Sequence, residues 1–167
     1  MQRKQIDKEK ALERLMSLCS RGEQCEWDLV RKLINWGISR GDQTEIIEYL
    51  KENNYLDNER FARSYANDKA RFSSWGPYKI RLELMKKRIS GPVIKDAVEA
   101  VDHSVWKEGL LKNAESKSRN LDLSGEEGYE NRQKLFRYLI SRGFSTASST
   151  KAVNLMKKRS EEREETD

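Results

Sequence analysis

The four residues WGIS at positions 36–39 recur in altered form as KRIS at positions 87–90 and as RGFS at positions 142–145. Each copy follows a segment whose apolar residues have helical spacing, and each copy precedes another such segment. A glycine in this turn can adopt the left-handed conformation that ends a helix, as we expect for Gly37 and Gly143. The serine that closes each copy is a favoured N-cap for the next helix. The turn therefore predicts three copies of a helix–turn–helix unit.

The apolar residues before the three turns keep one spacing, which indicates a tandem repeat. A leucine stands five residues before the apolar residue of each turn, and another apolar residue stands four positions before that leucine. No alternating run rich in Val, Ile and Thr suggests a strand. The pattern favours an all-α fold, an elongated and curved array of three tandem three-helix repeats. The matched positions are Leu29, Leu33 and Ile38, then Ile80, Leu84 and Ile89, then Leu135, Leu139 and Phe144.

The turns divide the chain into three repeats of about 50 residues. Asp57 is expected to be the N-cap that opens the second repeat. The third repeat carries an insertion in a polar loop, and the final segment KKRSEEREETD has no apolar residue to hold it in a core. The predicted ranges are 1–56, 57–103 and 104–156 for the repeats, near 120–131 for the loop insertion and 157–167 for the charged tail.

The positive charge of the chain is concentrated in the middle repeat. The whole chain has 33 Lys and Arg against 28 Asp and Glu, a net charge of +5. Between Asp57 and Ser90 nine basic residues stand against four acidic ones, so this stretch alone accounts for that excess. A local basic face indicates an anionic partner. The candidate contact residues are Arg60, Arg63, Lys69, Arg71, Trp75, Lys79, Arg81, Lys86, Lys87 and Arg88.

The aromatic residues of the middle repeat allow two interpretations. In the first, Trp75 and Tyr78 lie at the edge of the basic face and stack or pack on a partner. In the second, the aromatic residues, Tyr78 included, belong to the core, and Trp75 wedges the helix pair apart. The sequence leaves the choice open for Trp75. The residues that we expect to face inward in this repeat are Phe61, Ala62, Tyr65, Phe72, Ile80, Leu84 and Met85.

The sequence lacks the residues that most kinds of catalytic, metal-binding or phosphate-binding site require. Cys19 and Cys25 are expected to be reduced thiols in a cytoplasmic protein, with Cys19 in the core. His103 is the only histidine, and no set of cysteines accompanies it as in a zinc site. We find no phosphate-binding loop, no nucleophile motif and no apolar run of membrane-spanning length. We therefore predict no enzymatic activity, no cofactor, no metal and no membrane contact.

The middle repeat resembles a known protein family. The stretch NNYLDNERFARSYANDKARFSSWGPYKIRLELMKKRIS, Asn53–Ser90, is similar to the signature of the RecX family of bacterial recombinase regulators. The tandem three-helix units of that family agree with the repeat found here. Arg88 departs from the glycine that is usual at this turn, so we expect this turn to differ from those at Gly37 and Gly143. The residues that match the signature are Phe61, Ala62, Tyr65, Asp68, Lys69, Gly76, Pro77, Lys79 and Ile80.

The resemblance implies a regulator of the RecA recombinase in DNA repair, recombination and the SOS response. It implies binding along the groove of the recombinase filament on DNA, with inhibition as the usual effect, and contact with single- or double-stranded DNA without sequence specificity. We expect a monomer that acts without catalysis. The alternative from another class is a stand-alone DNA-binding helical module, which the same basic face supports. Without the signature, a helical scaffold for an unrelated protein would be the choice.

Overall fold

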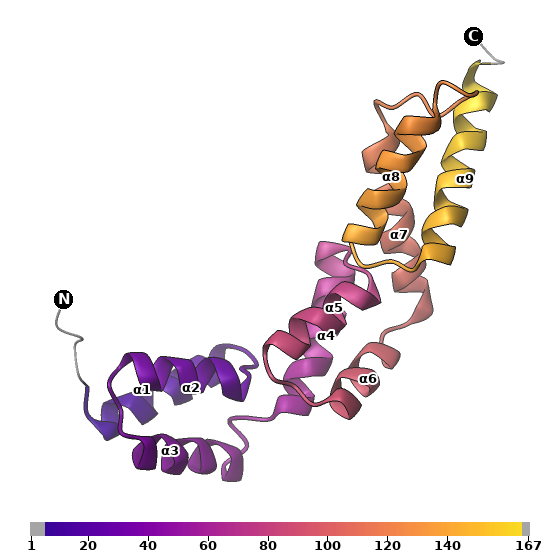
Figure 1. Cartoon of the computed structure of the whole chain (residues 1–167). Helices are drawn as coiled ribbons and strands as arrows, with labels where there is room; N and C mark the ends of the chain where they lie inside the picture. The colour runs from indigo at the N-terminus through magenta and orange to yellow at the C-terminus, as the bar shows by residue number, and fades with distance from the viewer. Residues whose placement is uncertain (1–5, 165–167) are drawn as a thin grey trace. The chain divides into compact units, whose positions relative to one another are not determined.

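The structure, a computed structural model, describes residues 6–164, and this range contains nine helices and no strand (Figure 1). The predicted all-α fold is therefore confirmed. The helices are α1 (Lys8–Arg21), α2 (Glu26–Asn35), α3 (Arg40–Glu52), α4 (Asn58–Ser73), α5 (Pro77–Lys86), α6 (Gly91–Glu99), α7 (His103–Ser118), α8 (Tyr129–Ser141) and α9 (Thr146–Glu164).

The three turns that follow α2, α5 and α8 have the same backbone geometry. In each turn the amide of the apolar residue donates to the carbonyl of the leucine five residues earlier, at 3.1, 3.2 and 3.2 Å. The preceding residue is left-handed in all three, with φ values of 76° at Gly37, 58° at Arg88 and 95° at Gly143. The expectation that the Arg88 turn would differ is therefore wrong. Arg88 adopts the same left-handed conformation although, unlike glycine, it has a Cβ atom that raises the energy of this conformation.

The predicted helix caps are present at three positions. The Ser39 hydroxyl accepts from the amide of Asp42 at 3.2 Å, and the Ser145 hydroxyl accepts from the amide of Ser148 at 3.1 Å. The Asp57 carboxylate accepts from the amides of the second and third residues after it, at 2.8 and 3.0 Å. Each contact satisfies an amide that has no partner inside its own helix. The serine turn is thus both a helix stop and a helix start.

The first compact unit contains residues 6–65 together with Leu84–Ala97. Its best-defined core belongs to α1, α2 and α3. Cys25, just before α2, is fully buried, whereas Cys19 in α1 is only partly buried. Cys19 packs against the core, in line with the expectation, while the fully buried side of α1 is formed by Ala11 and Leu15. The buried core residues of this group are Ala11, Leu15, Leu29, Leu33, Ile38, Ile46, Ile47, Leu50 and Leu56.

The second compact unit contains Ala66–Glu83 and residues 98–164. In it α7, α8 and α9 pack on one another around a small core. The connection between α7 and α8 covers residues 119–128, and α9 continues through positions 157–164, into the segment predicted as a tail. The middle repeat contributes residues to both units, and the predicted repeat boundaries stay predictions. The buried core residues of the third repeat are Ala114, Leu123, Leu135, Leu139, Ala152, Val153 and Met156.

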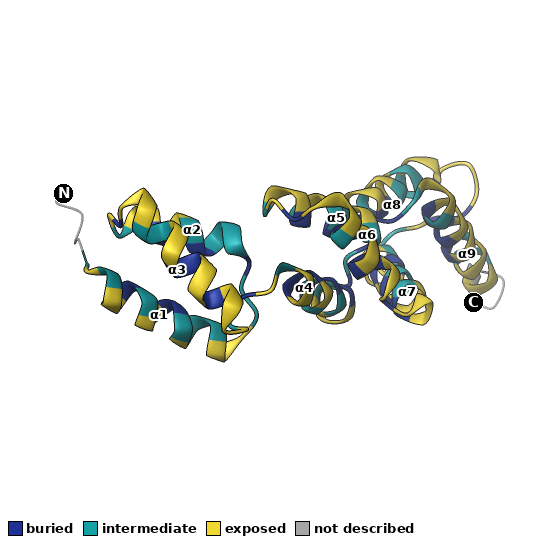
Figure 2. Ribbon diagram, turned by 90° about the horizontal axis from the view of Figure 1, so that it is seen from below, coloured by how far each residue is buried: buried dark blue, intermediate teal, exposed yellow. Residues whose placement is uncertain are grey.

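Buried and exposed positions alternate around single helices, as expected for amphipathic helices (Figure 2). In α4 the buried stripe runs through small residues, Ala62, Ala66 and Ala70, at intervals of four. Phe72 lies two positions beyond Ala70, on the opposite side of the helix, and is 81% exposed. The prediction of an inward-facing Phe72 is therefore wrong, and a large aromatic side chain lies in solvent.

Candidate partner-binding site

A three-residue turn, Ser74–Gly76, joins α4 to α5 in the second unit and carries Trp75. The Trp75 amide donates to the carbonyl of Lys69 at 3.1 Å, which closes the last turn of α4. Ser74 is left-handed, with φ of 50°, and Pro77 begins α5. Proline suits the first position of a helix because its missing amide would have no helical partner there. The sequence therefore fixes a sharp and well-defined turn around the tryptophan.

The turn at Arg142 and Gly143 in the third repeat forms hydrogen bonds with this turn. The Gly76 amide donates to the Arg142 carbonyl at 2.7 Å, and the Tyr78 amide donates to the Gly143 carbonyl at 3.0 Å. The Arg142 guanidinium donates to the carbonyl of Ser73. These contacts satisfy the free amides at the start of α5 and a carbonyl at the end of α4. The turn that presents Trp75 is thus fastened by hydrogen bonds on both sides.

A buried asparagine in α7 adds a further hydrogen bond to the same turn. Asn113 Nδ2 donates to the Ser74 carbonyl at 2.8 Å and to the Gly109 carbonyl at 2.7 Å. Its Oδ1 accepts from the Tyr138 hydroxyl at 3.1 Å. Sequence reasoning missed both Asn113 and Arg142 as residues that position the site. The available signal was Asn113 next to Ala114, where a polar side chain on a buried helix face requires partners.

Two lysines lie close to the Trp75 ring. Lys69 Nζ is 4.9 Å and Lys79 Nζ is 4.5 Å from the ring centroid. Both distances are within the range of cation–π attraction, which is strongest for tryptophan. Trp75 itself is half-buried, so it is neither a pure core residue nor fully exposed. We call Lys69, Trp75 and Lys79 the Trp75 cluster, in which one aromatic ring organises two positive charges.

Exposed apolar side chains accompany the Trp75 cluster. The buried stripe of α5 consists of Ile80 and Leu84, as predicted. Tyr78, Leu82 and Met85 lie on the other side of α5 and are 57%, 52% and 63% exposed. The expected inward orientation of Met85 is therefore wrong, and so is a core position for Tyr78. Arg81 lies over the Tyr78 ring, with Cζ 5.7 Å from its centroid. The outer side of α5 thus combines apolar and basic groups.

Three other predicted contact residues have intramolecular partners in the first unit. Arg60 Nε donates to Glu23 at 2.6 Å, and Lys87 Nζ contacts Asp28 at 2.5 Å. Arg88 Cζ lies 3.5 Å from the centroid of the Trp27 ring. These contacts link elements of the first unit to one another. They also leave the three side chains less free to bind a partner. Their role as partner contacts stays a prediction, as it does for Arg63, Arg71 and Lys86, which are all exposed.

The Lys87–Asp28 pair shifts the ionisation of both groups. Partial burial acts to raise the pKa of Asp28, but hydrogen bonds from Lys87 and Cys25 hold it below its ordinary value. Partial burial also acts to lower the pKa of Lys87, yet the bond to Asp28 keeps it above its ordinary value. Both shifts favour the charged forms in the folded protein. The pair is therefore a stabilising contact of the first unit.

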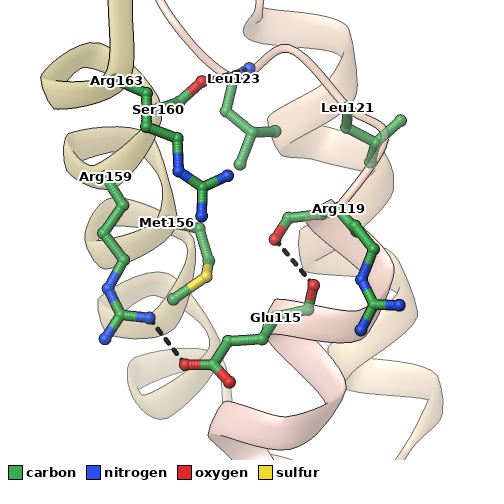
Figure 3. A pocket seen from close by; sticks show the side chains of 9 residues that line it. Glu115, Arg119, Leu121, Leu123, Met156, Arg159, Ser160 and Arg163 are labelled. Atoms are coloured by element: carbon green, nitrogen blue, oxygen red, sulfur yellow. Dashed lines mark hydrogen bonds and ion pairs between the residues drawn. The ribbon is translucent and has the colours of Figure 1, made fainter. Parts of the chain in front are cut away.

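A second basic feature lies in the third repeat, in a cavity of about 280 Å³ between the ends of α7 and α9 (Figure 3). Arg119, Arg159 and Arg163 line this cavity. Arg159 donates to the Glu115 carboxylate at 2.7 Å, as the dashed line in Figure 3 shows. Arg119 and Arg163 stand at helix C-termini, where positive side chains complement the helix dipoles, whereas Arg159 is paired with Glu115. This cavity is therefore accounted for by local electrostatics, and the Trp75 cluster is the stronger candidate.

Two kinds of site are absent from the described part of the chain. Within residues 6–164 no group of three or more His, Cys, Asp or Glu side chains is placed to hold a metal ion. None of the described helices is long and apolar enough to cross a membrane. His103 begins α7 at the boundary of the third repeat.

The chain is similar to known proteins over most of its length. The sequence model described as "RecX, second three-helix domain" matches residues 57–98, which include the Trp75 cluster. Regulatory protein RecX of Vibrio parahaemolyticus is 30% identical over 144 residues, 86% of this chain and 90% of that protein. Two Clostridium botulinum proteins of the same name are 36% and 31% identical, over 60% and 81% of this chain. The matches span only 47% and 63% of the lengths of these clostridial relatives.

Solved structures share the fold. A crystal structure of regulatory protein RecX, 26% identical, gives a TM-score of 0.74 and covers 84% of this chain and 68% of that chain. The crystal structure of RecX from Lactobacillus salivarius, 21% identical, gives a TM-score of 0.75 and covers 89% of this chain and 96% of that chain. The helical repeat is thus common to these proteins. With the sequence matches and the fold in agreement, the chain belongs to the RecX family of regulatory proteins.

Proposed function

We propose that this RecX-family protein binds the RecA recombinase filament on DNA and lowers its ATPase and strand-exchange activities. The observation that carries the proposal is the Trp75 cluster, which lies inside the segment matched by the family model. The protein acts without catalysis of its own, and the ATPase belongs to the partner. It acts as a cytoplasmic monomer on a partner that is itself a nucleoprotein.

The chemistry of the Trp75 cluster suits an anionic partner. The ammonium groups of Lys69 and Lys79 pair with phosphate or carboxylate oxygens through charge-assisted hydrogen bonds. The ring of Trp75 limits where the two side chains can go, so less conformational entropy is lost when an anion binds. Hydrogen bonds to Arg142, Gly143 and Asn113 keep the turn itself in place.

The apolar residues beside the cluster suit a protein surface. Phe72, Tyr78 and Leu82 are largely exposed and belong to the same unit as the cluster. Exposed aromatic and aliphatic side chains next to arginine are typical of the energetic centre of protein interfaces. A filament of recombinase on DNA offers both anionic phosphates and protein surface. This combination supports a nucleoprotein partner over naked DNA.

The proposal is tested by the rate of ATP hydrolysis by RecA on single-stranded DNA while the purified protein is titrated. We expect the rate to fall in the presence of this protein. The variant Lys69→Glu with Lys79→Glu should require at least about tenfold more protein for the same effect. The matched control Lys112→Glu with Lys134→Glu reverses two exposed charges on α7 and α8 and should inhibit normally. Circular dichroism checks that all variants keep their helices.

The DNA-binding alternative has the same basic cluster in its favour and makes different predictions. A stand-alone DNA module binds single or double strands without recombinase, and its affinity falls steeply as salt rises. Tight binding to naked DNA, together with an unchanged recombinase ATPase, would replace the proposed function with this alternative.

A further inference from the structure

A groove of about 610 Å³ runs along the third repeat, between α7 and α9. Its floor is apolar and consists of Trp106, Leu110, Leu111, Phe144 and Leu155. All residues that line the groove belong to the second unit, and most come from the third repeat. Pro77 is the one lining residue within residues 57–98 that match the family model, and no residue of the Trp75 cluster lines the groove, so the proposed function does not use it.

The rim of the groove carries positive charge. Lys107 on α7 and Lys151 on α9 both line it, and both are exposed. His103, at the start of α7, lies at the same rim. No Asp or Glu is among the residues that line the groove in the described part of the chain. An apolar floor with a basic rim is complementary to a segment that has apolar side chains flanked by carboxylates.

The first and third repeats differ in charge at two equivalent positions on their last helices, α3 and α9. In the first repeat Lys8 of α1 pairs with Asp42, at 3.2 Å, and with Glu45, both on α3. These ion pairs bridge the first and third helices of the repeat. Counted from the shared serine of the turn, the equivalent positions on α9 are Ser148 and Lys151, and both line the groove. The carboxylates that join the two helices in the first repeat thus have no counterpart at these positions in the third.

We propose that this groove binds a short amphipathic segment of a partner protein, with apolar anchors seated on Trp106 and Leu155 and carboxylates facing Lys107 and Lys151. Helical segments commonly bind such grooves through residues at i, i+3 or i+4, and i+7. The acidic end of this chain, residues 161–167, has carboxylates but no apolar side chain. It therefore lacks the anchors that the groove accepts, and a second polypeptide provides the better fit.

Binding is measured by fluorescence anisotropy of a labelled helical peptide of about sixteen residues, with Leu and Phe on one face and Glu beside them. A second peptide has the same apolar residues with Lys in place of Glu, and a third probe is a labelled single-stranded oligonucleotide. The full chain is titrated into each probe. We expect saturable binding of the Glu peptide, and binding of the Lys peptide weaker by at least about tenfold.

Two pairs of variants locate the bound peptide. Leu155→Glu places a charge in the groove, and its control Ile140→Glu alters a side chain of α8 with almost the same exposure, 39% against 38%. Lys107→Glu with Lys151→Glu reverses the rim, and Lys112→Glu with Lys134→Glu reverses two exposed lysines outside it. Each groove variant should weaken binding by about tenfold or more, and each control should leave it unchanged.

Three outcomes overturn the inference. The Glu peptide fails to bind saturably, or the Lys peptide binds equally well, or Leu155→Glu binds the peptide as tightly as Ile140→Glu does. If the oligonucleotide binds instead and is lost in Leu155→Glu, the groove is a nucleic-acid site. None of these results depends on recombinase, so the inference and the proposed function fail separately.

Discussion

Gly76 and Gly143 touch through their backbones. A Cβ atom on Gly76 would lie 2.3 Å from the carbonyl carbon and oxygen of Gly143, and a Cβ on Gly143 would lie 2.5 Å from the backbone nitrogen of Lys79. Only residues without a side chain allow this approach. The contact joins the turn that presents Trp75 to the turn of the third repeat. It therefore also sets the position of the Lys79 backbone beside Gly143.

Replacement of Gly76 by alanine should destabilise the protein strongly. The added methyl group meets backbone atoms, which cannot rotate away, and we expect a loss of about 2–4 kcal/mol of unfolding free energy. The control Gly41→Ala lies in α3, where an added Cβ meets nothing within 4 Å. That control should be neutral or stabilising by up to about 1 kcal/mol. Urea unfolding measures both, and equal stability of the two variants would show that the glycine contact is dispensable.

Arg88 offers a test of backbone strain. Its φ of 58° is costly for any residue with a Cβ, whereas its side chain stacks on Trp27. Arg88→Ala removes the stacking and keeps the strain, but Arg88→Gly removes both. We therefore expect the Gly variant to be the more stable of the two by about 1 kcal/mol. Thermal and urea unfolding provide the comparison, and a less stable Gly variant would mean that the turn is not strained.

The turns show what could be predicted from sequence and what could not. Helix positions, the buried stripe and the caps depend on local spacing, and the residues around Gly37, Ser39 and Ser145 therefore predicted them correctly. The exposure of Phe72 was missed because small alanines carry the buried stripe of α4. The contact between Gly76 and Gly143 was missed because it joins residues far apart in the chain. A lone sequence therefore identified the basic segment but not the groups that hold Trp75.

The ion pair between Lys87 and Asp28 should make stability depend on pH. The pKa of Asp28 is lowered on folding, so its contribution is present above its unfolded pKa, near 4, and is lost as pH falls through the folded value. The pKa of Lys87 is raised, so its contribution is present below its unfolded pKa, near 10.4, and is lost as pH rises through the folded value.

Asp28→Asn should therefore lower the unfolding free energy by about 1 kcal/mol at neutral pH. The difference from the unaltered protein should shrink in acid and disappear once the pH lies below the lowered pKa of Asp28, because the carboxyl is then protonated. Chemical unfolding at pH 7 and at about pH 3 measures it. A difference that is the same at both pH values would assign the effect to packing instead of charge.

The two cysteines should differ in reactivity. Burial raises the pKa of Cys25 to about 11, and burial also raises the pKa of the partly exposed Cys19. The thiolate is the reactive form, so Cys25 should react with a disulfide reagent at pH 8 about a hundredfold more slowly than Cys19. Cys25→Ala and Cys19→Ala each leave one thiol and give the separate rates. In denaturant the two rates should become similar, and equal rates in the folded protein would contradict the burial of Cys25.

The basic residues of the middle repeat should separate into two groups when their charges are reversed. Lys87 is paired with Asp28, so Lys87→Glu places two carboxylates together and should lower the melting temperature. Arg81 lies over Tyr78 on the outer side of α5, and Lys86 is exposed at the end of the same helix. Arg81→Glu with Lys86→Glu should raise the concentration for half-inhibition of recombinase ATPase by about tenfold.

The two measurements together distinguish an internal contact from a binding contact. Lys87→Glu is compared at a temperature where it is still folded, so that lost stability is not counted as lost affinity. If Arg81→Glu with Lys86→Glu inhibits normally while Lys69→Glu with Lys79→Glu does not, the partner contacts the Trp75 cluster and not the outer side of α5. If both double variants inhibit normally, the recombinase does not contact Lys69, Lys79, Arg81 or Lys86, because charge reversal at a contact with an anionic partner weakens binding.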